Sequence, residues 1–193
     1  MLEPRSAAPA LLLTALLVPA LGGGGGLLGV DAARAQEVVT QEEALRMAFP
    51  EADEMERRTA FLADSVMARA EELAAPAVEV DEPVVTHYVA RAGGTPLGVA
   101  YFDSHVVRTL PEVIMVVVTP PGDVARVEVL RFDEPREYRP PEKWLEEFRG
   151  KDLSSRISTS GSIVNITGAT LTSRAVTRAV RRVLALHRVI EPL

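Results

Sequence analysis

Four stretches rich in valine, isoleucine, tyrosine and phenylalanine follow one another in the middle of the chain. They are residues 84–91, 98–107, 112–119 and 125–132. Two glycines at residues 93–94 separate the first two stretches, and Pro-Pro-Gly-Asp at residues 120–123 separates the last two. Because β-branched and aromatic residues favour strands while glycine, proline and aspartate favour tight turns, this pattern predicts antiparallel hairpins.

Near the C-terminus, small and aliphatic residues recur with the period of an α-helix. They are Ala175, Val176, Ala179, Val180, Val183 and Leu184. This spacing predicts an amphipathic helix of about four turns with one apolar face. With further helices predicted ahead of the strands, the order of elements indicates an α+β domain: an antiparallel sheet built from hairpins and packed against helices.

Two short helices are predicted before the strands. Residues 40–43 read Thr-Gln-Glu-Glu, which is the pattern of a capping box, so a helix should begin there and end before Pro50. A second helix is expected over residues 65–74, capped by Asp64 or Ser65.

Three other segments complete the domain. Residues 55–62 fit neither a helix nor a strand clearly. Residues 142–148 place Trp144 and Phe148 on one helical face and predict a third short helix. Residues 151–165 contain five serines and little periodicity, which indicates a loop.

The first 35 residues differ in composition from the rest. No charged residue lies within residues 6–30, Arg5 precedes this stretch, and Ala-Arg-Ala at residues 33–35 fits a cleavage site. We therefore predict a secretory leader over residues 1–35 and a single domain over residues 36–193. The alternative is an uncleaved N-terminal membrane anchor, because a stretch of 25 uncharged residues is long enough to span a bilayer. Either way we expect an exported protein, periplasmic or anchored at the outer face of a bacterial inner membrane.

Charge and cysteine content exclude several classes of protein. Twenty-one basic residues against 27 acidic ones give a net charge of −6, which argues against a general nucleic-acid binder. The absence of cysteine excludes disulfides, thiolate metal sites, iron–sulfur clusters and c-type haem attachment within this chain. The three histidines, His87, His105 and His187, lack the spacing of a metal site. No Walker loop, nucleophile elbow or dinucleotide-binding glycine motif is present.

A hydroxyl-rich segment precedes the C-terminal helix and is the best candidate for a ligand site. Its residues are Thr167, Gly168, Ala169, Thr170, Leu171, Thr172 and Ser173. Small residues let a ligand approach the backbone, and the unpaired N–H groups of a first helical turn favour an anion such as phosphate. On these grounds alone, a capped helix without a ligand is the commoner explanation.

This segment resembles the flavin-attachment motif of the FMN-binding domain family, Ser/Thr-Gly-Ala-Thr-x-Thr-Ser, at every defined position. Asp-Glu-Pro at residues 133–135 resembles the Glu-x-Pro block of the family, and residues 144–151 resemble its Trp-x3-Phe-x-Gly-Lys block. The resemblance covers roughly residues 84–188. The family includes the periplasmic flavin subunits of the Rnf complex and of the sodium-pumping NADH:quinone reductase. Their Glu-Thr-Pro-Gly-Leu-Gly stretch is replaced here over residues 133–138, so we expect a stand-alone relative.

The resemblance implies that the chain binds FMN covalently, through a phosphoester to the hydroxyl of Thr170. It assigns the remaining residues of the hydroxyl-rich segment to the cofactor site. It also implies an exported flavin transferase and a membrane electron-transfer partner, for a protein that carries electrons rather than acting on its own substrate. The family usually has an acidic residue where this chain has Val164. The alternative is therefore a cofactor-free or reversibly FMN-binding exported module that docks to a membrane redox complex.

Two groups of side chains admit both a structural and a functional explanation. Trp144 and Phe148, with Tyr138 nearby, could flank a flavin ring, although such aromatic residues more often belong to a core. Four arginines should lie on the polar side of the last helix: Arg174, Arg178, Arg181 and Arg182. Solvated arginines are the commoner explanation, and contact with an acidic partner or an anionic membrane surface is the alternative.

Overall fold

The computed structural model describes residues 39–75 and 77–193, so the predicted leader lies outside the described residues. The elements are α1 (Gln41–Ala48), β1 (Glu54–Phe61), α2 (Asp64–Ala74), β2 (Val84–Ala92), β3 (Thr95–Val106), β4 (Pro111–Val118), β5 (Val124–Phe132), η1 (Arg136–Tyr138), α3 (Glu142–Leu145), η2 (Glu146–Phe148) and α4 (Thr170–Ile190). The two η elements are short 3-10 helices. Among these helices, none combines the length and the apolar character that crossing a membrane requires.

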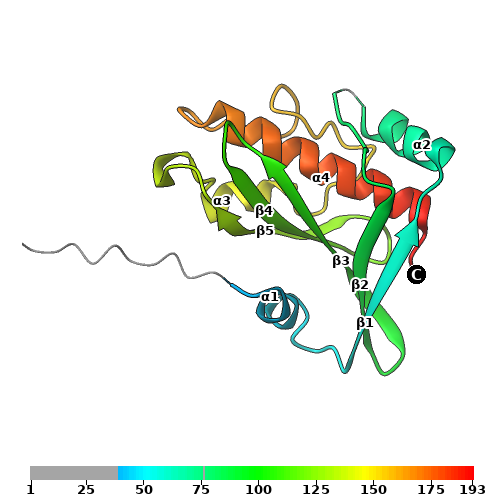
Figure 1. The fold of residues 1–193 in the computed structure, drawn as a ribbon. Helices are drawn as coiled ribbons and strands as arrows, with labels where there is room; N and C mark the ends of the chain where they lie inside the picture. Colours follow the sequence, from blue (N-terminus) through cyan, green and yellow to red (C-terminus); the bar gives the residue numbers. More distant parts are fainter. Residues whose placement is uncertain (1–38, 76) are drawn as a thin grey trace, which may run out of the picture. The chain divides into compact units, whose positions relative to one another are not determined.

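The five strands form one antiparallel sheet in the order β1-β2-β3-β4-β5, so each strand pairs with its neighbours in sequence (Figure 1). The predicted α+β class and the predicted hairpins are confirmed. The segment that fitted neither pattern forms β1, an edge strand whose side chains alternate between exposed and half-buried over most of its length. Four of the eight residues of β1 are charged, so the sequence does not show the alternation of apolar and polar residues that is typical of a strand. The strand conformation is fixed by pairing with β2 along the whole length of β1.

The sheet opens between β2 and β3, which run apart beyond the end of their shared ladder (Figure 1). Their pairing ends at His87 and Tyr101. Beyond this point residues 84–86 pair only with β1, and residues 102–106 pair only with β4. We call the space between these two segments the β2–β3 opening.

The C-terminal helix α4 packs its apolar side on one face of the sheet. Val176, Ala179 and Val180 lie there in a core that includes Val116 of β4 and Phe132 of β5. The helix has 21 residues and is longer than predicted. The prediction missed residues 170–174 because the two buried residues among them, Thr172 and Ser173, are polar.

The opposite face of the sheet is covered by α1. Ala44, Leu45 and Phe49 pack there against Met115 and Leu130. The predicted capping box is present: the backbone N–H of Glu43 donates to the Thr40 hydroxyl at 3.2 Å, and the N–H of Thr40 donates to the Glu43 carboxylate at 2.9 Å. The helix ends at Ala48, as the prediction required.

The predicted cap of α2 is wrong, whereas the later segments agree with prediction. The N-cap is Ala63, with no side-chain capping bond, and Asp64 is the first helical residue. The Asp64 carboxylate lies in the first turn of α2, where it interacts favourably with the positive end of the helix dipole. An acidic residue can therefore stabilise this end of a helix without capping it. Residues 142–148 form α3 and η2, and residues 151–165 form a loop.

Trp144 and Phe148 belong to the core, as the commoner explanation held. Their rings pack edge to face with centroids 5.2 Å apart, and 6% and 0% of the two residues is exposed. The indole N–H of Trp144 donates to the backbone carbonyl of Val164 at 2.5 Å. This bond ties the loop before α4 to α3 and so helps to position the start of α4.

Candidate functional site

The seven predicted site residues lie where the loop meets α4. Thr170 is the first helical residue, and Ala169 is the N-cap, without a side-chain capping bond. Gly168 has a φ of 85°, a left-handed conformation that glycine adopts without strain. The first N–H groups of a helix have no acceptor within it, so this uncapped end offers donors to an anionic group.

The hydroxyls of this segment divide into two kinds. The Ser173 hydroxyl is buried and fully used: it donates to the carbonyl of Ala169 and accepts from the N–H of Ile166, both at 3.0 Å. Thr170 is half-buried, and its hydroxyl oxygen accepts one bond, from the Asn165 amide at 3.1 Å. Thr167 is exposed. Thr170 is therefore the hydroxyl that combines access with a fixed position.

A small cavity of about 230 Å³ lies at the beginning of α4, and we call it the α4 cavity. Five of its lining residues come from the predicted segment, Gly168 to Thr172, and two others are Arg108 and Tyr138. The guanidinium carbon of Arg108 lies 5.7 Å from the centre of the Tyr138 ring, a cation–π contact. Trp144 and Phe148 do not line this cavity.

Arg108 was not predicted, and a buried carboxylate explains its place. One oxygen of Glu134 accepts the backbone N–H groups of Arg108, Thr109 and Leu110 at 3.1, 2.8 and 3.0 Å. These backbone bonds, that of Thr109 foremost, lower the pKa of Glu134. Glu134 thus holds the loop between β3 and β4 with Arg108 at the α4 cavity. The Asp-Glu-Pro block at residues 133–135 was the sequence signal for this part of the site. Within it, Glu134 is the buried residue that holds the Arg108 loop, whereas Asp133 forms an ion pair with Arg131.

The α4 cavity is positive in character within an acidic chain. Its one charged lining residue is Arg108, and the uncapped start of α4 adds the positive end of the helix dipole. Donors of this kind fit a phosphate group, and the open backbone at Gly168 leaves space for close approach, since a Cβ added there would meet no atom within 4 Å.

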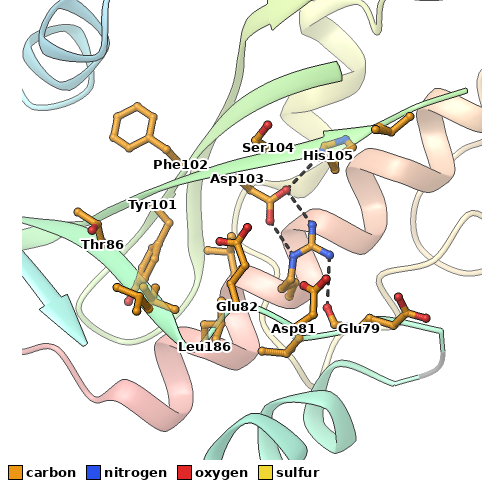
Figure 2. Close-up of a pocket in the computed structure, with 16 residues that line it drawn as sticks. Glu79, Asp81, Glu82, Thr86, Tyr101, Phe102, Asp103, Ser104, His105 and Leu186 are labelled. Atoms are coloured by element: carbon orange, nitrogen blue, oxygen red, sulfur yellow. Dashed lines mark hydrogen bonds and ion pairs between the residues drawn. The ribbon is translucent and has the colours of Figure 1, made fainter. Parts of the chain in front are cut away.

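A second and larger cavity, of about 470 Å³, occupies the β2–β3 opening (Figure 2). A buried ion pair lies beside it: Arg182 of α4 donates two hydrogen bonds of 2.8 Å to the two carboxylate oxygens of Asp103. His105 lies between Asp103 and Glu112, at 2.9 Å from the first and 3.1 Å from the second.

The titration of this cluster follows from its geometry. Burial disfavours a charged imidazole, but the hydrogen bonds to Asp103 and Glu112 outweigh burial and raise the pKa of His105 to about 9. Burial also disfavours the Asp103 carboxylate, yet its bonds with His105 and Arg182 lower its pKa. Burial raises the pKa of Glu112, so Asp103 is the carboxylate that secures the charge on His105.

Two of the four predicted helix arginines are not on a solvated face, which corrects that prediction. Arg182 pairs with Asp103, and Arg181 donates to the carbonyls of Ala74 and Ile157 at 2.7 and 3.1 Å. The other two, Arg174 and Arg178, are exposed as predicted. In the part of the chain that the structure describes, no group of three or more histidine or acidic side chains is arranged to hold a metal ion.

Comparison with known proteins identifies a family similarity. Residues 111–185 match the family model described as the FMN-binding domain. The matched range runs from the start of β4 into α4 and includes the whole predicted segment. The search of curated proteins found no match to this chain.

Proposed function

Because residues 111–185 match the family model described as the FMN-binding domain, we propose that the chain is an exported flavoprotein that carries electrons through FMN held at the beginning of α4. The observation that carries this proposal is the α4 cavity, where the predicted attachment segment meets an uncapped helix start and Arg108. The predicted leader over residues 1–35 is the basis for proposing export.

We infer that the attachment is covalent, through the hydroxyl of Thr170. In the proposed step a flavin transferase uses FAD: the Thr170 oxygen forms a bond to the phosphorus of the FMN moiety, the diphosphate bond of FAD breaks, and AMP leaves. The hydroxyl proton is lost in the exchange. Ser173 is a poor site for this transfer because its hydroxyl is buried and already makes two hydrogen bonds.

The residues of the α4 cavity fit the phosphoester that would result. A phosphodiester keeps one negative charge, which the first-turn N–H groups of α4 and the guanidinium of Arg108 would stabilise. When bound, the flavin ring supplies the uptake and release of electrons. Leu171 and Val164 near the cavity are 48% and 67% exposed, which suits exchange of electrons with a partner at the surface.

Val164 stands where the family usually has an acidic residue, but a carboxylate lies beside it. Glu147 of η2 accepts the backbone N–H of Val164 at 2.8 Å. An acidic group therefore lies next to this position although the sequence shows none there. This arrangement supports modification by the transferase, and Glu147→Gln should lower the yield of flavinylation without changing its site.

Mass spectrometry tests the covalent attachment. The protein is co-expressed with a flavin transferase and exported, and the tryptic peptide of residues 157–174 is sequenced by fragmentation. We expect the mass of an FMN phosphoester on Thr170, its loss in Thr170→Val and its retention in the matched control Thr167→Val. An unmodified peptide from a protein whose flavin is released by acid would support reversible binding instead. A colourless protein that still binds its redox partner would support the cofactor-free alternative.

A further inference from the structure

β3 has one unpaired edge along residues 102–106. Pairing with β2 ends at His87 and Tyr101, whereas pairing with β4 continues as far as Val106 and Pro111. One edge of this five-residue stretch is therefore used by β4, and the other faces the β2–β3 opening.

Alternation along an antiparallel pair identifies the backbone groups on the free edge. The N–H of Val107 donates to the carbonyl of Leu110 at 3.2 Å. Every second residue before Val107 therefore directs its N–H and C=O groups at β4, and the residues between them direct these groups away. The residues between are Phe102, Ser104 and Val106. Within residues 39–75 and 77–193, no backbone hydrogen bond engages them from the side of the opening.

The cavity of about 470 Å³ lies along this edge (Figure 2). Arg182, Val183 and Leu186 of α4 contribute to its lining from one side, and residues 84–86 of β2 from another. An added strand lies about 4.8 Å from its neighbour. The opening therefore offers the two requirements for strand addition, which are unused backbone groups and space beside them.

The charge of the lining favours a basic occupant. The segment between α2 and β2 brings the exposed side chains of Glu79, Asp81 and Glu82 to the cavity (Figure 2). The charge of Arg182 is already neutralised by Asp103. The lining as a whole carries four carboxylates, with Asp103 included, against the two cations Arg182 and His105, so the cavity is net negative.

We propose that the edge of β3 at residues 102–106 binds an extended, basic polypeptide segment by strand addition. Backbone bonds to Phe102, Ser104 and Val106 would supply affinity, and the acidic rim would select lysine or arginine side chains. A second copy of this chain is a poorer occupant, because each copy carries a net charge of −6 and the same acidic rim. The two surfaces are distinct: Arg182 lies about 18 Å along α4 from Thr170, and only the Val106 end of the free edge comes near Arg108 of the α4 cavity.

A labelled peptide tests the proposal on the full chain. The probe is a fluorescein-labelled, end-blocked peptide of the pattern Lys-Val-Lys-Val-Lys-Val-Lys, and binding is followed by fluorescence anisotropy. Ser104→Pro removes one N–H from the free edge and leaves the bonds to β4, because that N–H points away from β4. We expect this variant to bind the peptide roughly tenfold more weakly than the wild type. The matched control Ser104→Ala, which keeps the N–H, should bind like the wild type.

Two further measurements keep the test decisive even if Ser104→Pro folds poorly. In the wild type, the peptide should slow hydrogen exchange of the amides of residues 102, 104 and 106, and a Glu-Val peptide of the same length should not bind. A variant that removes the three acidic charges of the rim should bind the Lys-Val peptide more weakly and with less dependence on salt. It combines Glu79→Gln, Asp81→Asn and Glu82→Gln. Equal binding of the acidic peptide, or protection confined to other amides, would overturn the proposal. So would a self-association that Ser104→Pro abolishes, because the occupant would then be a second copy.

Discussion

The α4 cavity and the β2–β3 opening lie at two places along the same helix and offer opposite chemistry. The first is lined by a helix start, small residues and one arginine, so it suits an anion. The second is lined by three exposed carboxylates and an unpaired strand edge, so it suits a basic chain. The comparison shows how one helix serves two surfaces: its uncapped beginning faces a phosphate site, and its middle supplies the arginine that holds the sheet beside the opening.

The largest effect is expected from the buried ion pair beside the opening. Arg182→Met keeps an unbranched apolar side chain but removes the guanidinium, so the buried Asp103 carboxylate keeps only His105 as a cationic partner. We expect the free energy of unfolding to fall by about 3 kcal/mol in urea denaturation at pH 7. The matched control is Arg178→Met, on the exposed side of α4, which should change the stability by less than about 0.5 kcal/mol. Equal effects of the two substitutions would mean that the ion pair does not stabilise the opening.

The dependence of stability on pH should show two histidines acting in opposite directions. The folded pKa of His105, about 9, lies above its usual value of 6.5, so its contribution is complete below pH 6.5 and is lost as the pH rises through 9. Burial lowers the pKa of His187 to about 4, so its contribution is complete above pH 6.5 and is lost as the pH falls through 4.

Urea denaturation from pH 4 to pH 10 measures both slopes. Stability should be greatest near pH 6.5, and His105→Gln should flatten the alkaline slope while leaving the acid one. An alkaline slope unchanged in His105→Gln would show that another group titrates there.

A smaller effect is expected at the α4 cavity, on binding rather than on folding. Arg108→Gln removes the one charged side chain that lines the cavity. For protein produced without a transferase, we expect FMN to bind roughly tenfold more weakly, measured by quenching of flavin fluorescence. Arg108→Lys should recover part of the affinity. The control Arg174→Gln lies on the same helix outside the cavity and should bind FMN like the wild type, so a loss in both would indicate a general charge effect.

The smallest effect is expected from the anchor of the Arg108 loop. Glu134→Gln keeps an acceptor oxygen but removes the charge that strengthens its three backbone bonds. Hydrogen exchange at the amides of residues 108–110 should become faster, and the affinity for FMN should fall less than in Arg108→Gln. An unchanged exchange rate at these three amides would contradict the role given to Glu134.

The difference between the two regions also explains which one could be predicted from the sequence. The lining of the α4 cavity comes mainly from the consecutive residues 168–172, so a linear motif contains most of it. Arg108 escaped prediction because the bonds of Glu134, far away in the sequence, hold its loop there. The β2–β3 opening has no linear signature, since its lining comes from separate segments of the chain.

The fold was predictable where one face of an element is consistently apolar. The strands from β2 to β5 and the apolar face of α4 follow such patterns, and β1 was missed because charged residues fill much of it. The same limit explains the error on the helix arginines. Arg182 has the sequence pattern of a solvated residue, and its partner Asp103 lies 79 positions away.

The position of the flavin is the central claim, and a nitrogen-15 NMR titration of the apoprotein with FMN tests it most directly. The account predicts that the largest shifts fall on the amides of residues 168–172 and on the side chain of Arg108, while residues 79–86 and 102–104 remain unchanged. Shifts concentrated in the β2–β3 opening, with the beginning of α4 unaffected, would contradict it.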